Sequence, residues 1–208
     1  MHWKDWVKTA LICGGFEELF YEELNMKILV INGNPHSGDG TFDDYLDRLV
    51  ERMKHDGHEA DLMRLRDMKI KPCVGCFNCW IKTPGICSIR DDAGEVSKRY
   101  IHAEHVVLAS PLIMGFISAL LKNAMDRNIP LVHPHLEEID GEVHHKKRYD
   151  QYPVISFLLE KEASTDDEDL AIASDIFRRE AINVRGSLGF IHFTETPVEE
   201  VLHAIDVH

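Results

Sequence analysis

Residues 27–41, KILVINGNPHSGDGT, decide the fold of this chain. Residues 27–31 form a short, apolar and β-branched run, which predicts a buried parallel strand. Residues 32–35 then turn the chain into a glycine-rich loop. Apolar residues recur beyond it at helical spacing: Phe42, Tyr45, Leu46, Leu49, Val50 and Met53. The stretch therefore predicts a strand, a loop and a helix in that order.

The same alternation continues to the end of the chain. Four further strands are predicted at residues 58–65, 105–110, 154–159 and 187–193, the second of these four ended by Pro111. Helices are predicted from about residue 91, at 117–125, at 166–181 with a Thr165/Glu168 capping box, and after Thr196 with Pro197 at its first position. Five strands alternating with helices predict a doubly wound α/β fold with one parallel sheet. Any ligand should lie at the carboxyl ends of the strands, among loops 33–41, 111–117 and the charged turn 160–163.

Composition excludes several classes of function. The chain has 208 residues, of which 44% are apolar and 28% charged, and this balance is typical of a soluble globular protein. Acidic residues outnumber basic ones by 36 to 23, which gives a formal charge of −13. Nucleic acids and anionic membrane surfaces both select a basic footprint, so neither is an expected partner. The sequence contains no apolar run of the roughly 20 residues that a membrane-spanning helix needs.

Five cysteines are present, and four of them, Cys73, Cys76, Cys79 and Cys87, fall within one short segment. An odd number without a recognisable secretory signal does not indicate a disulfide framework. We therefore expect a cytoplasmic protein whose clustered thiols bind metal or do redox work. The fifth, Cys13, is expected to be a small buried apolar residue.

Two segments lie outside the regular alternation. Residues 1–25 carry apolar residues at helical spacing and predict a helical extension that packs on the main domain, 26–208, or on a partner. Residues 129–153 form a long polar insertion that contains His133, His135, His144 and His145 among acidic residues. Such a mixture can bind a divalent metal, but an insertion of this kind is more often a surface excursion or a dimer-forming arm.

The first loop has the composition of a phosphate-binding loop. It places glycines, Asn34, Ser37 and Thr41 where the N–H groups at the start of a helix lack partners. It matches neither the Walker nor the Rossmann glycine spacing. A plain strand-to-helix turn with Thr41 as N-cap is the alternative.

Three stretches together resemble the flavodoxin-like NAD(P)H-dependent FMN reductases, and within them the branch that includes the iron–sulfur flavoproteins. They are KILVINGNPHSGDGT, KPCVGCFNCW (residues 71–80) and VVLASPLIMGFISALLKNAMDR (residues 106–127). The resemblance implies a five-stranded sheet in the order 2-1-3-4-5 with helices on both faces. It also implies that the first loop wraps the FMN phosphate. Of the family's Gly-Ser-Pro-Arg and later Thr, this chain keeps Gly33, Pro35 and Thr41, with Asn34 and His36 at the other two positions.

The resemblance gives a set of residues that would bind FMN. From the first loop they are Asn34, Pro35, His36, Ser37, Gly38, Thr41 and Phe42. From the second loop, which would pack along the isoalloxazine edge, they are Pro111, Leu112, Ile113, Met114, Gly115 and Phe116. Core packing is the alternative for Leu112 and Ile113. The aromatic residue common near position 113 or 114 is absent here, so Phe116 or Trp80 would supply a ring contact.

The cysteine spacing, with gaps of two, two and seven residues, admits three interpretations. Four thiolates at this spacing can ligate one [4Fe–4S] cluster, as the resemblance to iron–sulfur flavoproteins also implies. A four-thiolate zinc site is the second interpretation, although two gaps that share Cys76 suit a cuboidal cluster better than two separate zinc knuckles. Free thiols are the third.

These observations lead to three functional hypotheses. The first is an FMN-dependent oxidoreductase that passes electrons from NAD(P)H to a quinone-like, flavin or other small acceptor. The second is an iron–sulfur flavoprotein that carries electrons between protein partners, with a ferredoxin-like donor. The third is a redox-sensing, flavin-binding module without turnover. In each case we expect a homodimer or a higher homo-oligomer.

Overall fold

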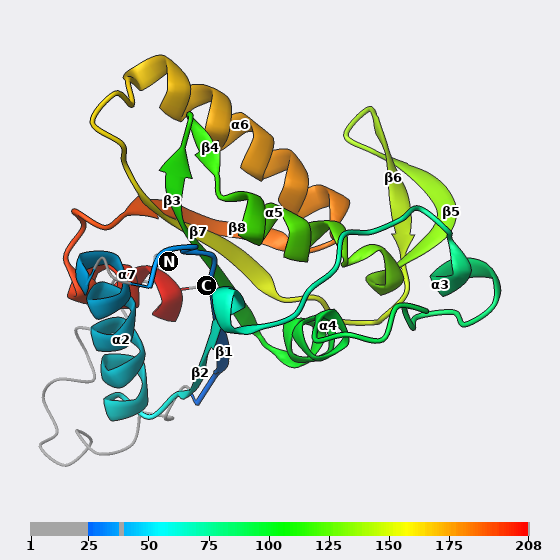
Figure 1. Cartoon of the computed structure of the whole chain (residues 1–208), viewed down its shortest axis with the longest axis horizontal. Coiled ribbons are helices and arrows are strands. Elements are labelled where there is room, and N and C mark those ends of the chain that lie inside the picture. Colours follow the sequence, from blue (N-terminus) through cyan, green and yellow to red (C-terminus); the bar gives the residue numbers. More distant parts are fainter. Residues whose placement is uncertain (1–24, 38–39, 208) are drawn as a thin grey trace, which may run out of the picture.

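The computed structural model describes residues 25–37 and 40–207, in which helices flank a main sheet and a small hairpin stands apart from it (Figure 1). The predicted extension up to residue 24, Cys13 and Gly38 lie outside these residues. The strands are β1 (Lys27–Asn32), β2 (Glu59–Arg64), β3 (His105–Ile113), β4 (Phe116–Ile117), β5 (Val132–Ile139), β6 (Glu142–Lys147), β7 (Val154–Glu160) and β8 (Ser187–Phe193). The helices are α2 (Gly40–His55), α3 (Asn78–Ile81), α4 (Ala93–His102), α5 (Ala119–Asp126), α6 (Asp167–Asn183) and α7 (Val198–Asp206), with short 3₁₀ turns η2 (Leu65–Asp67) and η3 (Ile129–Leu131).

The main sheet has the order β2-β1-β3-β7-β8, and all five strands are parallel. Numbered among themselves along the chain, these strands read 2-1-3-4-5, so the predicted doubly wound topology is confirmed. The carboxyl ends of β1 and β3 are neighbours, because Asn32 pairs with Ala109. The loops that follow these two strands therefore meet at one edge of the sheet.

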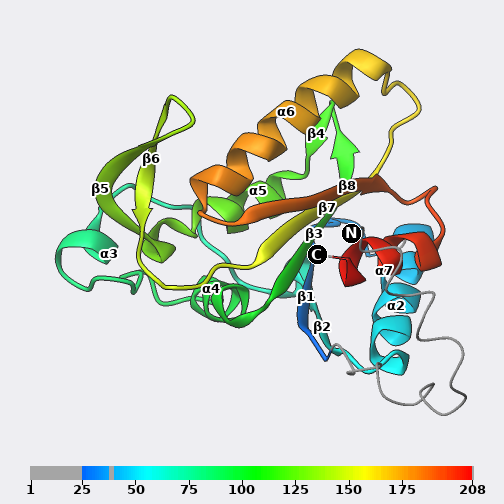
Figure 2. The ribbon, with the colours of Figure 1, turned by 180° about the vertical axis from the view of Figure 1, so that it is seen from behind.

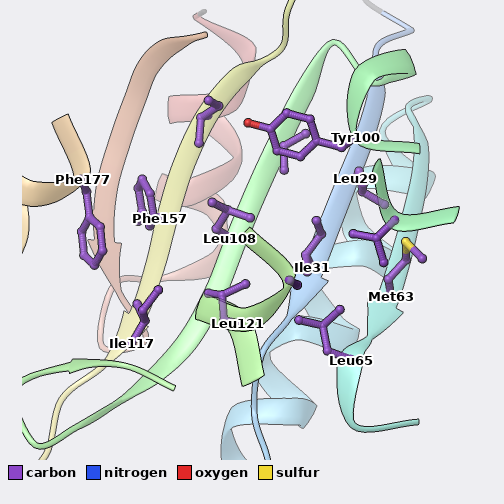
Figure 3. Packing of buried hydrophobic residues seen from close by; sticks show 14 of the residues in the cluster. Leu29, Ile31, Met63, Leu65, Tyr100, Leu108, Ile117, Leu121, Phe157 and Phe177 are labelled. Atoms are coloured by element: carbon purple, nitrogen blue, oxygen red, sulfur yellow. The ribbon is translucent and has the colours of Figure 1, made fainter. Parts of the chain in front are cut away.

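Helices cover both faces of the sheet, as predicted. α2 and α7 lie on one face, and α4, α5 and α6 lie on the other (Figures 1 and 2). On the second face, one continuous apolar cluster joins the sheet to the three helices, and Figure 3 shows its central side chains from Leu29 to Phe177. Successive strand residues alternate between the two faces: Val30 packs toward α2, and Ile31 toward α5. Both faces of the sheet are thus buried, which explains the near-continuous apolar strands.

Strand β3 runs past Pro111 to Ile113, contrary to the prediction that the proline ends it. Pro111 occupies the last position of the ladder with β7, opposite Glu160, where a missing N–H is tolerated. The chain then folds back as β4, which pairs antiparallel with β3. Met114 and Gly115 form the reversal with φ of 55° and 76°. Helix α5 starts after this strand, at Ala119 rather than at residue 117, because Ser118 caps it by accepting a hydrogen bond from Leu121 N.

Three helix starts differ from the predicted caps. Helix α2 begins at Gly40, so Thr41 lies inside it and is not its N-cap. The capping box of α6 is made by Asp166 and Asp169, one residue later than predicted, while the Thr165 hydroxyl accepts from Glu162 N. Helix α7 begins at Val198, and Pro197 is its N-cap without a side-chain bond. Asp166 rather than Thr165 caps α6, because a carboxylate at a helix N-terminus also interacts favourably with the positive end of the helix dipole.

The insertion 129–153 contains a two-stranded antiparallel hairpin, β5 and β6, separate from the main sheet. It stands next to the short helix α3, which periodicity did not predict because four residues are too few to show a period (Figure 1). Among the described residues, no helix is long and apolar enough to span a membrane.

Candidate functional site: two strand-end loops and a four-cysteine segment

The loop after β1 is held by hydrogen bonds to its own side chains. Asn32 Oδ1 accepts from Asn34 N at 2.8 Å, and Asn34 Oδ1 accepts from His36 N at 3.0 Å. These bonds satisfy two backbone donors within the loop, because Asn side chains can take the place of a neighbouring backbone partner. These bonds therefore fix the path of the chain from Asn32 to His36.

Gly33 joins this loop to the second one. Its N–H donates to Ala109 O of β3 at 2.8 Å, and its carbonyl accepts from the Ser118 hydroxyl. A Cβ at this position would lie 2.5 Å from the Cβ of Leu121 and 3.2 Å from Ala109 O. Gly33 is therefore required by the close approach of β1, β3 and α5.

An ion pair lies behind the first loop and was not identified from the sequence. Arg66 of η2 donates to both carboxylate oxygens of Asp43 in the first turn of α2, at 3.2 and 2.5 Å, and to Asn34 O at 3.4 Å. Asn32 Nδ2 also donates to Asp43, at 2.7 Å. Burial raises the pKa of Asp43, but the hydrogen bonds from Arg66 and Asn32 and the charge of Arg66 hold it below its usual value. A negative charge in the first turn of α2 is thus paired internally, which leaves the positive end of the helix open to an anion.

The predicted FMN residues of the first loop divide into two groups. Pro35, His36, Ser37 and Thr41 are exposed at the start of α2. Asn34 is buried, and its amide nitrogen also points to Asp43, at 3.4 Å. Phe42 is buried in the core that α2 forms with the sheet.

The second loop also has both exposed and buried side chains. Met114 is 93% exposed, Pro111 is partly buried and Ile113 is exposed, whereas Leu112 is buried in the core. Phe116 stacks on Phe177 of α6, with ring centroids 5.7 Å apart. Met114 is therefore the most exposed side chain of the predicted isoalloxazine loop.

The third predicted loop contacts the second. Gly115 N donates to Glu162 Oε2 at 3.3 Å, and a Cβ on Gly115 would lie 3.5 Å from a carboxylate oxygen of Asp169. All three predicted strand-end loops thus converge at one edge of the sheet. Trp80 does not take part: α3 lies at the far side of the molecule from β4 in both views (Figures 1 and 2).

The cysteine segment follows η2 and makes a tight turn before α3. Gly75 and Phe77 have φ of 63° and 55°, and this left-handed backbone bends the chain around the thiols. All four cysteines line one small apolar cavity of about 20 Å³ together with Ile129. Cys79 is buried and Cys87 partly buried, while Cys73 and Cys76 are exposed.

The thiols influence one another's ionisation. Burial raises the pKa of Cys79, and the neighbouring Cys87, Cys73 and Cys76 raise it further. The pKa of Cys76 is lowered by a hydrogen bond from the backbone N–H of Asn78 and by the Ser88 hydroxyl. Within residues 25–37 and 40–207, no group of three or more His, Cys, Asp or Glu side chains is arranged to hold a metal ion. The donor chemistry is nevertheless the one that a cuboidal cluster takes: four thiols border one cavity, and ligands at the corners of a cluster stand farther apart than ligands of a single ion.

Two long-range contacts, neither predicted from the sequence, fix this segment. Arg127, just after α5, donates to Cys87 Sγ at 3.3 Å and forms an ion pair with Asp91. Trp80 Nε1 donates to Ile129 O at 3.1 Å and Val132 O at 3.0 Å, where the hairpin begins. The Trp80 ring also lies 4.9 Å from the His145 ring of β6. The insertion therefore packs against the cysteine segment.

The histidines of the insertion have separate surroundings. The rings of His133 and His135 are 6.0 Å apart, while His144 is buried and paired with Asn183 Oδ1 of α6 at 2.9 Å. The metal interpretation of these histidines gains no support from the arrangement. Whether the insertion also forms a dimer arm stays a prediction.

The sheet order and the convergent strand-end loops define a flavodoxin-like protein. The chain belongs to the NADPH-dependent FMN reductase family, whose sequence model matches residues 26–143, more than half of it. The predicted superfamily is thereby confirmed, and the match extends from β1 through the cysteine segment into the hairpin.

Curated relatives agree with the predicted branch. An iron–sulfur flavoprotein of Archaeoglobus fulgidus is 36% identical over 103 residues, which are 50% of this chain and 49% of the relative. Another, from Methanocaldococcus jannaschii, is 35% identical over 106 residues, covering 51% of this chain and 53% of the relative. The matched segment thus spans about half the length of these relatives.

Solved structures share the fold at low identity. An NAD(P)H:quinone oxidoreductase from Methanothermobacter marburgensis is 15% identical with a TM-score of 0.59, covering 88% of this chain and 97% of that one. An FMN-dependent NADH-azoreductase from Bacillus anthracis is 16% identical with a TM-score of 0.57, covering 88% and 95%. These likenesses confirm the flavodoxin-like fold over nearly the whole chain.

Proposed function

We propose that this protein is an FMN-dependent oxidoreductase that takes electrons from NAD(P)H, carries a [4Fe–4S] cluster in its four-cysteine segment, and reduces a quinone-like, flavin or other small acceptor. One observation carries the proposal: four thiols, from Cys73 to Cys87, border a single cavity in a chain of the FMN reductase family. Bound FMN would exchange electrons between a two-electron donor and the one-electron cluster.

The chain's own residues would bind and orient the flavin. The N-terminus of α2, with Ser37, Thr41 and His36 exposed beside it, would hold the phosphate through backbone donors and hydroxyl groups. The Met114–Gly115 reversal would lie along the ring system, where Met114 offers an exposed thioether and Gly115 allows close approach. The pairing of Asp43 with Arg66 would keep a carboxylate from repelling the phosphate.

A cavity beside the cysteines would suit a small acceptor. Cys87 also lines a larger cavity of about 300 Å³, together with Ile101, Tyr149 and the basic Lys98. This volume is at the lower end for ligand pockets and its walls are mainly apolar. An acceptor bound there would lie next to a cluster ligand.

Anaerobic purification tests the proposal. We expect flavin absorbance together with a broad shoulder that bleaches on reduction, about four iron and four sulfide per chain, and NADH or NADPH oxidation that depends on an added quinone or flavin. Replacing the buried ligand with C79S should remove iron and sulfide and leave FMN bound. The matched control is S88A, which removes a neighbour of Cys76 that is not a ligand. Flavin without iron in the anaerobic wild type would exclude the cluster.

A second candidate is an electron carrier between protein partners. It is favoured by the exposed surface around the cysteines, where Val74 is 71% and Ile81 76% exposed next to the exposed Cys73 and Cys76. Such apolar surface suits contact with another protein. Reduction of the flavin by a reduced ferredoxin but not by NAD(P)H would favour this candidate. If neither turnover with NAD(P)H nor flavin reduction by a protein donor occurs, the redox-sensing module is favoured instead.

Location and assembly belong to the same proposal. We infer that the protein works in the cytoplasm, where thiols remain reduced, and that it forms a homodimer or a higher homo-oligomer. Sedimentation of the flavin-loaded protein would measure the assembly.

A further inference from the structure

Arg127 lies behind the cysteine cavity and is almost completely buried. Its side chain is 1% exposed, and that of its partner Asp91 is 4% exposed. The guanidinium pairs with the carboxylate through two hydrogen bonds: NH1 donates to Asp91 Oδ2 at 2.8 Å, and NH2 donates to Oδ1 at 3.0 Å. This is the bidentate arrangement in which an arginine has the least freedom to turn.

The same guanidinium reaches two other segments. NH2 also donates to Cys87 Sγ at 3.3 Å, and NH1 donates to Lys71 O. Asp91 in turn accepts from Lys71 N at 2.9 Å and from Ala93 N at 3.2 Å. One ion pair thus joins three parts of the chain: the residues just before Cys73, the return segment that carries Cys87, and the start of α4.

A buried charge in this position requires an explanation beyond folding. Apolar side chains of similar size would fill such a position as well or better, because burying an ion pair removes two charges from water. Among the described residues the other arginine ion pairs are more exposed, such as Arg66–Asp43 at 15% and 17% and Arg99–Glu95 at 44% and 47%, and Arg99 contacts no thiol there. Arg127 differs because one of its donors is aimed at a cysteine sulfur.

We propose that Arg127, held by Asp91, is a positioning residue for the iron–sulfur cluster: it fixes Cys87 and donates a hydrogen bond to that ligand's sulfur, which raises the reduction potential of the cluster. This inference rests on the cluster of the proposed function. Reduction adds a negative charge to the cluster and its thiolates, so a donor pointed at one thiolate stabilises the reduced form more than the oxidised form. The effect is large for a donor in a buried, low-dielectric position whose direction is already fixed.

The test is a redox titration of the anaerobically purified holoprotein, with dithionite as reductant and the cluster followed by electron paramagnetic resonance and visible absorbance. Two variants separate charge from direction. R127K retains a positive charge but loses the planar fork, and R127Q/D91N replaces the ion pair with a neutral pair and avoids leaving one charge buried alone. R99Q is the control, because it removes a surface arginine that pairs only with carboxylates.

We expect the reduction potential of the cluster to shift to more negative values in both Arg127 variants, with the larger shift in R127Q/D91N. R99Q should not change it. A purely structural role would lower the unfolding temperature without moving the potential of the cluster that remains. Unchanged potentials in both variants would overturn the inference. If R127Q/D91N fails to fold or to hold iron, R127K decides alone in the same way. Wild-type protein that holds no iron or sulfide would instead refute the cluster itself, and the two failures are therefore distinguishable.

Discussion

The two parts of the candidate site are held in place by different means. The flavin-side loops, residues 33–37 and 110–118, are fixed by bonds between neighbouring strand ends and the helices that follow them, such as Gly33 N to Ala109 O. The cysteine segment, residues 72–91, contains no strand. It is held at the α5–β5 connection by two side chains: Arg127, which lies in that connection and bonds to Cys87, and Trp80 of the segment, which bonds to Val132. A parallel sheet therefore positions the first part, and side-chain contacts of long sequence range position the second.

The difference has a consequence for stability. Contacts between adjacent buried strands break only when the sheet itself opens, whereas a segment tied at two points can open locally. We therefore expect substitutions in one part to leave the other intact, and the following substitutions test that expectation.

The largest effect is expected from G33A. The added Cβ would lie 2.5 Å from the Leu121 Cβ, and the backbone of both loops must shift to admit it. Such overpacking costs about 1–3 kcal/mol, so FMN affinity should fall by about tenfold or more. Fluorescence titration with FMN measures the loss. G94A is the matched control, because no atom lies within 4 Å of a Cβ there. Iron content should not change, and a parallel loss of iron would contradict the separation of the two parts.

W80A should destabilise the cysteine segment and leave the flavin-side loops unchanged, the opposite of G33A. It removes the one indole N–H, whose hydrogen bond is shared between two carbonyls at the start of the hairpin and contributes about 1 kcal/mol, together with ring contacts to Phe77 and His145 that contribute about 1 kcal/mol more. Hydrogen exchange should show residues 72–91 opening about 2 kcal/mol more easily. The neighbouring I81A, in an exposed side chain, is the control and should have little effect. Faster exchange at residues 33–37 in W80A would contradict the comparison.

D43N should destabilise the flavin side by about 1–2 kcal/mol at neutral pH, because Asp43 accepts hydrogen bonds from the charged Arg66. The pKa of Asp43 is held below its usual value of 3.8. Its stabilising contribution is therefore complete above that value and is lost as the pH falls through the lowered pKa. Chemical denaturation between pH 7 and pH 3 should show the two proteins converging at low pH. D44N, in the adjacent exposed residue, should show no such convergence.

The smallest effect is expected at Glu180 of α6, which lines a cavity with Cys73 and His145. Burial raises its pKa above the usual 4.5, against a hydrogen bond from Asn183 that lowers it. The charged form is therefore disfavoured in the folded state, and stability falls as the pH rises past 4.5. E180Q should be slightly more stable than the wild type at pH 7 and equal to it below the unfolded-state pKa. E51Q on the exposed side of α2 is the control in the same urea titration. An equal gain in stability in E51Q would show that burial of Glu180 does not cause the effect.

Local pattern was sufficient for most of the fold. Residues 187–193 form β8 as predicted, because an apolar strand between turn signals shows its period within a few residues. Helix ends were less predictable: at α6 an aspartate displaced the predicted threonine cap by one position. Pro111 misled the prediction because its effect on a strand depends on its place in the ladder, which only pairing with β7 determines.

The candidate site was predictable to a similar extent. The loops and the four cysteines were found from composition and spacing, because they are contiguous in the chain. Arg66 and Arg127 were not found, and Trp80 was assigned to the flavin rather than to the hairpin, because nothing near them in the sequence indicates their distant partners. Their partners lie 23, 36 and 49 positions away, at Asp43, Asp91 and Ile129.

The sequence by itself therefore determined the alternation of strands and helices, the edge of the sheet where a ligand would bind, and the thiols available for a cluster. These properties depend on side-chain period and local backbone preference, which act over a few residues. Only the tertiary structure decided that Asp43 is neutralised by Arg66, that the hairpin packs on Trp80, and that Arg127 is directed at Cys87. Those contacts depend on where the sheet and its connections bring distant segments together, and no local pattern encodes that distance.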